Sequence, residues 1–198
     1  MNTIVVGSGN PDKLKEIRLL LKDLKVRVIP VTHFKNVPDV VEDGRTFAAN
    51  AAKKARFYSR LSPHVTIADD SGLCVRALKN APGVYSARYA GPGCTYADNN
   101  RKLLKNLSHK KGTQRAAFFV STIAVYRAGK KIALLKGVCH GRIADAALGT
   151  HGFGYDPVFI PRGARKTFSQ MTPAQKNRIS HRSRALSATK KFLRKYFR

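Results

Sequence analysis

Acidic residues are scarce in this chain: 11 Asp and Glu stand against 38 Lys and Arg, which gives a formal net charge of +27. The 42 residues that follow Asp156 contain twelve Lys or Arg and no acid. Such a balance favours polyanionic partners, so an RNA-binding protein is one interpretation. Yet the basic residues are spread along the whole chain, with neither a basic low-complexity block nor an RNA-recognition signature. We therefore expect at most non-specific nucleic-acid adhesion.

Cysteine and long apolar runs are also scarce. Cys74, Cys94 and Cys139 are an odd number without a Cys-x-x-Cys pair, which argues against a disulfide framework and a structural zinc site. No run approaches a membrane span, and the N-terminus lacks the apolar stretch of a signal peptide. We expect a cytoplasmic protein with no membrane association. Its 198 residues suffice for a single domain over residues 1–198 that buries about 70% of its unfolded surface.

Two common hydrolase signatures are absent. The sequence has no Gly-x-Ser-x-Gly elbow and no His-Glu-x-x-His motif, which argues against a serine hydrolase and a zinc hydrolase. Cys139 and His140 are adjacent on an expected strand, so their side chains point to opposite faces, and we interpret them as structural.

Apolar periodicity predicts helices that alternate with strands. Strands are expected over residues 3–7, 26–31, 65–69, 116–126, 131–139 and 158–160. Helices are expected from Pro11, over residues 46–61 and 95–107, as a turn near Pro173, and from about Ser180. The strands over 116–126 and 131–139 are expected to form an antiparallel hairpin. The sequence therefore predicts an α/β protein with a mixed sheet, without repeats or linkers.

The sequence Asp69-Asp70-Ser71-Gly72 follows the apolar run of residues 65–68 and concentrates two of the few acids. Adjacent carboxylates repel each other unless a cation or a shared proton relieves them, and a magnesium ion is the natural candidate. The alternative is a polar turn in which the aspartates accept bonds from nearby backbone amides.

The first strand-to-helix turn resembles a phosphate-binding cradle. Small residues let backbone amides approach an anion, and the helix N-terminus adds its dipole. Ser8, Asn10 and Lys13 could bind phosphate oxygens, although an ordinary helix cap explains Asn10 equally well. Asp12 replaces the third glycine of a dinucleotide fingerprint, so the turn follows no standard motif.

Aromatic and cationic residues occupy further notable positions. Phe153 and Tyr155 lie in a glycine-rich loop over residues 152–157, where they form either a stacking platform or a cover over the core. Lys54 lies on an apolar helix stripe, although its stem could simply cover that surface with the head in water. His181 and Arg182 lie in the first turn of the last helix, where the macrodipole disfavours positive charge. An anionic or carbonyl group opposite them would explain that position.

Six blocks in order, spanning nearly the whole chain, resemble the ITP/XTP pyrophosphatase family. They lie within residues 8–16, 46–55, 68–73, 82–89, 152–157 and 176–182. The resemblance implies an elongated mixed β-sheet flanked by helices, two lobes with a cleft between them, and a homodimer. It implies an enzyme that hydrolyses ITP, dITP and XTP to the nucleoside monophosphate and pyrophosphate, cleansing the nucleotide pool.

The resemblance also implies roles for individual residues. It implies an Mg²⁺ centre at Glu42, Asp69 and Asp70, with Asp70 as general base and with Lys13 and Lys54 as catalytic cations. Substrate contacts are implied for Phe153, which would stack on the purine, and for Ser8, Gly9, Asn10, Pro11, Asp12, Lys13, Ser71, Gly154, Tyr155, Asp156, Lys176, His181 and Arg182. Among the base contacts, His181 and Arg182 would donate hydrogen bonds to a 6-oxo group.

The chain departs from the family pattern at Ala49, His151 and Gln175, where Glu, Gly and Glu respectively are usual. None replaces an expected catalytic carboxylate, so the departures bear on fine specificity. Two alternatives stay open: a basic RNA-binding protein on a pyrophosphatase-like fold, and a pyrophosphatase of other modified nucleotides. The intact acids Glu42, Asp69 and Asp70 favour an enzyme over the first alternative, because phosphate binding alone does not need them.

Overall fold

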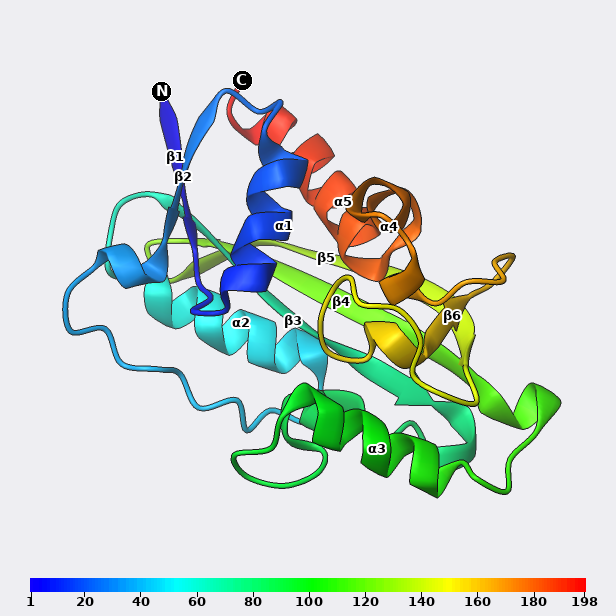
Figure 1. Ribbon diagram of the computed structural model, residues 1–198. Helices are drawn as coiled ribbons and strands as arrows, with labels where there is room; N and C mark the ends of the chain where they lie inside the picture. Colours follow the sequence, from blue (N-terminus) through cyan, green and yellow to red (C-terminus); the bar gives the residue numbers. More distant parts are fainter. The chain divides into compact units, whose positions relative to one another are not determined.

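The computed structural model describes residues 1–198 and contains a six-stranded sheet in the order β2-β1-β3-β4-β5-β6 (Figure 1). β1 pairs in parallel with β2 and β3, whereas β5 and β6 pair antiparallel. The predicted α/β class with a mixed sheet is therefore confirmed. The strands are β1 (Asn2–Val6), β2 (Val26–Pro30), β3 (Val65–Val75), β4 (Ala116–Arg127), β5 (Lys130–Ile143) and β6 (Phe159–Pro161).

Four of the five helices begin after a side-chain cap. The five helices are α1 (Pro11–Leu21), α2 (Phe47–Tyr58), α3 (Tyr96–Asn106), α4 (Pro173–Ile179) and α5 (His181–Tyr196). Asn10 caps α1 by accepting bonds from the amides of Asp12 and Lys13 at 2.9 and 3.1 Å. Thr95 and Asp98 form a capping box at the start of α3. None of the helices combines the length and apolar character needed to cross a bilayer.

β3 differs from the expectation that it stops at Asp69. It continues through Asp69-Asp70-Ser71-Gly72 to Val75, so the alternative of a polar turn at the two aspartates is wrong. β1 pairs with β3 only from Val65 to Ile67, and β4 is the neighbour of β3 on its other side. Ser121 of β4 contacts Asp69, so β4 still lies beside β3 at the two aspartates. Successive side chains on a strand point to opposite faces, so the two carboxylates separate.

The hairpin of β4 and β5 has the expected position, although β5 runs to Ile143 instead of ending at residue 139. Ala128 and Gly129 connect the strands with positive φ angles of 49° and 76°. Two central residues with positive φ are typical of a tight hairpin turn, and glycine adopts that conformation without strain.

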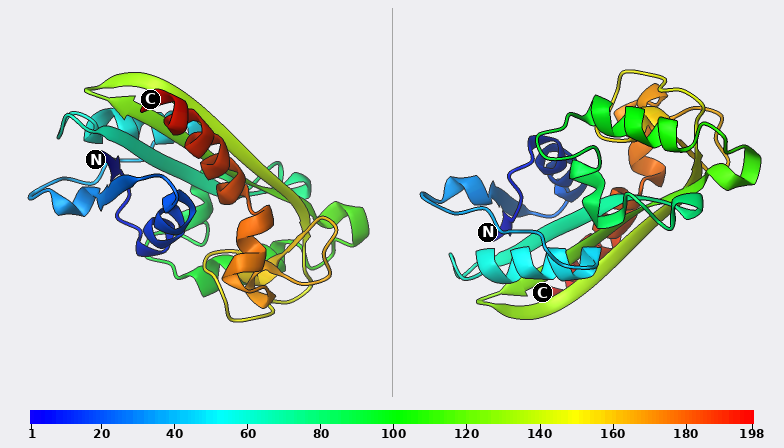
Figure 2. Two further views of the ribbon diagram at one scale, coloured as in Figure 1. Left: turned by 90° about the horizontal axis from the view of Figure 1, so that it is seen from above. Right: turned by 90° about the horizontal axis from the view of Figure 1, so that it is seen from below.

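The chain forms two compact units: residues 1–70, 121–137 and 182–198 make the first, and residues 71–120 and 138–181 make the second. In the first unit, α1 and α5 cover one face of the sheet and α2 covers the other (Figure 2). Ile67 packs with α1 and α5, whereas its neighbour Ala68 packs with α2. Leu186 and Leu193 of α5 are buried, whereas Tyr196 is 37% exposed.

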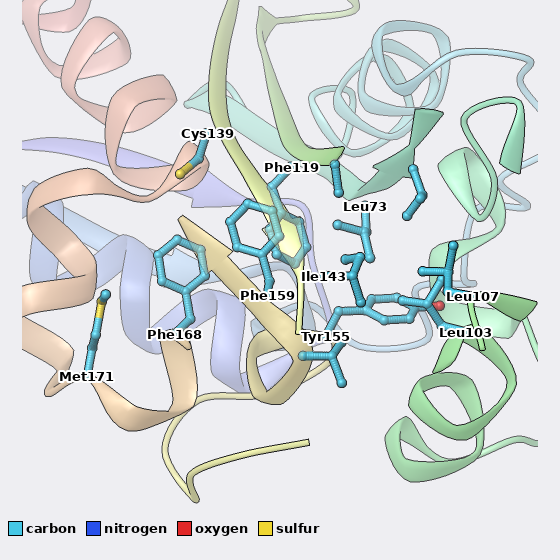
Figure 3. Packing of buried hydrophobic residues seen from close by; sticks show 13 residues of the cluster. Leu73, Leu103, Leu107, Phe119, Cys139, Ile143, Tyr155, Phe159, Phe168 and Met171 are labelled. Atoms are coloured by element: carbon cyan, nitrogen blue, oxygen red, sulfur yellow. The ribbon is translucent and has the colours of Figure 1, made fainter. Parts of the chain in front are cut away.

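The second unit is built around an aromatic core (Figure 3). Phe119 meets Phe159 edge to face at 4.7 Å between ring centroids, and Phe168 lies 5.2 Å from Phe159. Leu103 and Leu107, at the end of α3, are fully buried in the same cluster. This anchors α3 and leaves the start of the helix available for other contacts.

Candidate active site

Asp69 is an ionised carboxylate buried among cations in the first unit. Its Oδ2 lies 3.0 Å from Lys13 Nζ and 3.4 Å from Arg182 Nη2, and Ser121 Oγ donates to its Oδ1 at 2.5 Å. Burial alone would raise the pKa of Asp69, but Lys13, Arg182 and the Ser121 hydroxyl outweigh burial and hold that pKa well below its usual value. Asp69 is therefore an anchor for cations from α1 and α5.

Arg182 is shared by two carboxylates. Besides Asp69, its guanidinium contacts Glu16 of α1 through Nη1, and its side chain is only 3% exposed. A guanidinium presents several donors in a fixed plane, so it can hold two acids at once. Arg182 therefore links α1, β3 and the start of α5.

Asp70 belongs to the other face of β3, where Lys54 and Glu42 lie. Lys54 Nζ contacts Glu42 Oε1 at 2.9 Å and the main-chain oxygen of Asp69 at 2.9 Å, and Lys54 is 7% exposed. The alternative of a lysine head in water is therefore wrong. Burial and the neighbouring Glu42 carboxylate raise the pKa of Asp70 from 3.8 to about 6, against the lowering effects of Lys54, Lys13 and Asn50.

The loop that carries Glu42 is held against α2. Asn50 Oδ1 accepts a bond from the amide of Gly44 at 2.7 Å. A Cβ at Gly44 would lie 2.5 Å from that same oxygen, so the close approach requires glycine. Lys53 also contacts Asp43 at 2.7 Å on the exposed side. These contacts fix the place of Glu42 beside Lys54.

The three expected acids do not gather into one metal-binding cluster. No group of three or more His, Cys, Asp or Glu side chains that could hold a metal ion is present. The magnesium centre expected at Glu42, Asp69 and Asp70 stays a prediction. Asp69 and Asp70 follow each other on a strand, so their side chains point to opposite faces. Glu42 and Asp70 remain as a like-charged pair that a divalent cation would relieve.

The turn of residues 7–13 presents small groups at the start of α1. Ser8 Oγ accepts a bond from the Asn10 amide at 3.2 Å, and the Asn10 side chain serves as the helix cap. Gly9, Pro11 and Asp12 are exposed. Lys13 directs its ammonium toward Asp69, which places a cation beside a helix N-terminus.

The glycine-rich loop of the second unit is organised by Asp156. Its Oδ2 accepts bonds from the Phe153 amide at 2.9 Å and from Lys176 Nζ at 2.6 Å, and both charged side chains are nearly inaccessible. Lys176 Nζ also lies 4.9 Å from the centre of the Phe153 ring. Gly152 has a φ of +78°, and a Cβ there would lie 2.1 Å from Asp156 Oδ2. The loop is therefore a defined platform for the half-buried Phe153.

The two loop aromatics have different environments. Tyr155 is 5% exposed within the core of the second unit, and its hydroxyl donates to the main-chain oxygen of Ser86 at 2.9 Å. Burial raises the pKa of Tyr155. His181 stacks on Phe119 at 4.5 Å with the rings 9° from parallel, also in this unit. Ser71, the first residue of the second unit, is half-buried in β3.

Several site residues escaped the sequence analysis. Glu16 lies three residues after Lys13 on α1, a helical spacing that could have indicated it. Ser121 is a hydroxyl inside the apolar strand β4, where a buried polar group needs a partner. Asn50 on α2 had no distinctive sequence signal.

The chain belongs to the Ham1 family, whose sequence model matches residues 4–192. A dITP/XTP pyrophosphatase of Caldanaerobacter subterraneus subsp. tengcongensis is 43% identical over 196 residues, which cover 98% of each chain. The structure of a HAM1 protein from Coxiella burnetii superimposes with a TM-score of 0.90 at 40% identity, covering 98% of this chain and 100% of that one. The Staphylococcus aureus Ham1 protein gives 0.87 at 37% identity, with coverage of 98% and 100%. The expected family relationship is confirmed.

Proposed function

We propose that this chain hydrolyses non-standard purine nucleoside triphosphates, namely ITP, dITP and XTP, to the nucleoside monophosphate and pyrophosphate. The relatives named dITP/XTP pyrophosphatase cover nearly its whole length. The observation that carries the proposal is the arrangement of Asp70, Glu42 and Lys54, in which two buried or half-buried carboxylates flank a lysine. Binding a phosphate group alone would not need those acids, which repel it.

The residues of the first unit fit the phosphate end of such a substrate. Attack of water on the α-phosphate needs charge neutralisation and positioning more than covalent catalysis. We propose that the turn of residues 7–13 and Lys13 bind the triphosphate. Lys13 and Lys54 would stabilise the negative charge that develops on the phosphate in the transition state. Asp70 is the general base in this proposal, because a pKa near 6 suits proton transfer at neutral pH.

Glu42 and Asp70 would hold a magnesium ion together with substrate phosphates. Mg²⁺ in nucleotide enzymes is bound by one or two carboxylates plus phosphate oxygens, and it neutralises phosphate charge when bound. Two acids that repel each other are a donor set of that kind. Asp69 stays outside this set, since it already holds Lys13 and Arg182.

The second unit offers groups for a purine base. We assign base stacking to Phe153 and hydrogen bonding to Lys176 and His181. Asp156 orients Lys176 and the loop. Because Arg182 holds Glu16 and Asp69, we assign it a role in organising the acids instead of a direct contact to the base.

The test is pyrophosphate release from ITP, XTP, GTP and ATP in the presence of Mg²⁺. We expect ITP and XTP to be cleaved to the monophosphate, with ATP cleaved far more slowly. An RNA-binding protein on this fold would release no pyrophosphate from any of them. A pyrophosphatase of other modified nucleotides would be active only on a wider panel.

We further propose a homodimer of single-domain chains that acts in the cytoplasm on the nucleotide pool, on the strength of the family resemblance. Each chain has a mass of 21.9 kDa. Sedimentation equilibrium would give twice this mass for a dimer, and one cooperative thermal transition would support a single domain.

A further inference from the structure

The start of α3 lies against the glycine-rich loop in the second unit. Tyr96 and Asn100 are four residues apart on this helix, so they share one face. Both reach the same short segment: Asn100 contacts Gly154, and Tyr96 lies beside Phe153. No role of the loop described so far involves α3.

Asn100 holds the main chain next to Phe153. Its Nδ2 donates to the Gly154 oxygen at 2.9 Å, and Asn100 is 6% exposed. Asp156 fixes the segment from its other side by accepting from the Phe153 amide at 2.9 Å. Gly154 has a φ of +63°. Because glycine can adopt several backbone conformations, hydrogen bonds are needed to select this one. The two bonds therefore restrain the main chain that carries the Phe153 ring.

Tyr96 places a second ring beside Phe153. The ring centroids are 6.1 Å apart and the planes are tilted by 41°. A flat base held between two rings needs a separation of roughly 7 Å, twice the contact distance of about 3.5 Å. Tyr96 is 45% exposed on the first turn of its helix, so a small outward rotation of its side chain makes that space.

Packing of the helix does not explain the position of Tyr96. Leu103 and Leu107 bury the far end of α3 in the core. Asn99 ties the near end to the preceding loop, accepting from the Ala90 amide at 2.7 Å and donating to the Ala87 oxygen at 3.2 Å. Tyr96 therefore presents a partly exposed ring beside Phe153, and nucleobases stack on exposed aromatic rings.

We propose that Tyr96 is a second base-contacting ring of the purine site and that Asn100 is a positioning residue for Phe153. This inference rests on the proposed function and extends it: α3 determines how tightly the base is held, independently of the phosphates. Substitutions at either residue should therefore leave the affinity for a ligand without a base unchanged.

The experiment separates base affinity from phosphate affinity. For Tyr96→Ala we expect the KM for ITP and the dissociation constant of IMP, measured by titration calorimetry, to rise about tenfold, as expected for loss of one stacking ring. The turnover number and inhibition by pyrophosphate should stay within about twofold of the parent protein. Tyr96→Phe should bind IMP like the parent. Tyr85→Ala is the matched control, because Tyr85 is an equally large tyrosine, 60% exposed, in the same unit.

For Asn100→Ala we expect a weaker affinity for IMP with unchanged pyrophosphate inhibition, and partial recovery in Asn100→Gln, which keeps the amide donor. The role of Tyr96 is overturned if Tyr96→Ala leaves the affinity for IMP unchanged. It is also overturned if this variant loses pyrophosphate inhibition by the same factor as IMP affinity. The same two results in Asn100→Ala overturn the role of Asn100. If the parent protein binds IMP but releases no pyrophosphate from ITP or XTP, the proposed function fails while the calorimetry still decides this inference.

Discussion

Asp69 and Asp70 are neighbours in the chain, yet their carboxylates point to opposite faces of β3. Asp69 binds Lys13 and Arg182 on the side of α1 and α5, whereas Asp70 interacts with Glu42 and Lys54 on the side of α2. Both carboxylates are buried, yet their pKa values shift in opposite directions. Cations keep Asp69 ionised, but at Asp70 burial and a second carboxylate favour the protonated acid.

Asp70→Asn should lower turnover on ITP by about a hundredfold or more, which is typical of losing acid-base catalysis. The fold and the affinity for IMP should be retained, because asparagine has the same shape. Pyrophosphate release and calorimetry with IMP measure the two quantities. Near-parental turnover would remove Asp70 from the role of base.

The same substitution should stabilise the metal-stripped protein at pH 8. In the folded chain Asp70 binds its proton up to about pH 6, whereas the unfolded chain loses it near 3.8. Stability therefore falls as pH rises from about 4 to 6, and the full penalty persists above that range. Two pKa units correspond to about 3 kcal/mol. Urea unfolding in EDTA should show Asp70→Asn more stable at pH 8, with the difference vanishing toward pH 4; a constant difference would contradict the pKa assignment.

Glu42→Gln should weaken the response to magnesium more than the maximal rate. The change removes a charge from the proposed ligand pair, so the Mg²⁺ concentration for half-maximal rate should rise by about tenfold or more. High Mg²⁺ should restore much of the rate. Asp43→Asn is the control, since Asp43 is the adjacent exposed acid and pairs with Lys53. If added magnesium restores nothing, Glu42 is not a ligand.

Local signals in the sequence predicted the helices and strands, whereas the contacts around the acids depend on how those elements pack. Caps such as Asn10 and Thr95 and the periodic apolar positions of α1 and β4 are local signals, so most helices and strands were located correctly. The separation of Asp69 from Asp70 depends on β3 continuing through both residues beside β4, which is a property of the sheet. Ser121 and Glu16 contact Asp69 and Arg182 only after β4, α1 and α5 have packed.

The net charge of +27 should make the protein adhere to RNA in a strongly salt-dependent way. A site of six to ten phosphate contacts loses about a thousandfold or more in affinity between 50 and 200 mM salt, because counterions are released on binding. Fluorescence anisotropy with unrelated RNA sequences across this range checks the slope. Sequence-selective affinity that survives 200 mM salt would favour the alternative of an RNA-binding protein.

A pair of substitutions at neighbouring positions should separate base selection from organisation of the acids. Arg182→Ala removes the shared partner of Glu16 and Asp69, so we expect kcat/KM to fall by the same factor for ITP and ATP. The melting temperature should also fall, because buried acids lose a partner; breaking such a pair costs about 3 kcal/mol. Arg184→Ala is the matched control, since Arg184 is exposed on the same helix.

His181→Phe keeps a ring against Phe119 but removes both imidazole nitrogens. If His181 donates to the 6-oxo group of the base, ITP should lose more than ATP, whose 6-amino group cannot accept that bond. We expect the ITP to ATP ratio of kcat/KM to narrow by about tenfold or more, since unpaired buried donors discriminate strongly. The opposite result would be equal losses of kcat/KM for ITP and ATP in His181→Phe, together with a narrowed ITP to ATP ratio in Arg182→Ala. That result would assign base selection to Arg182.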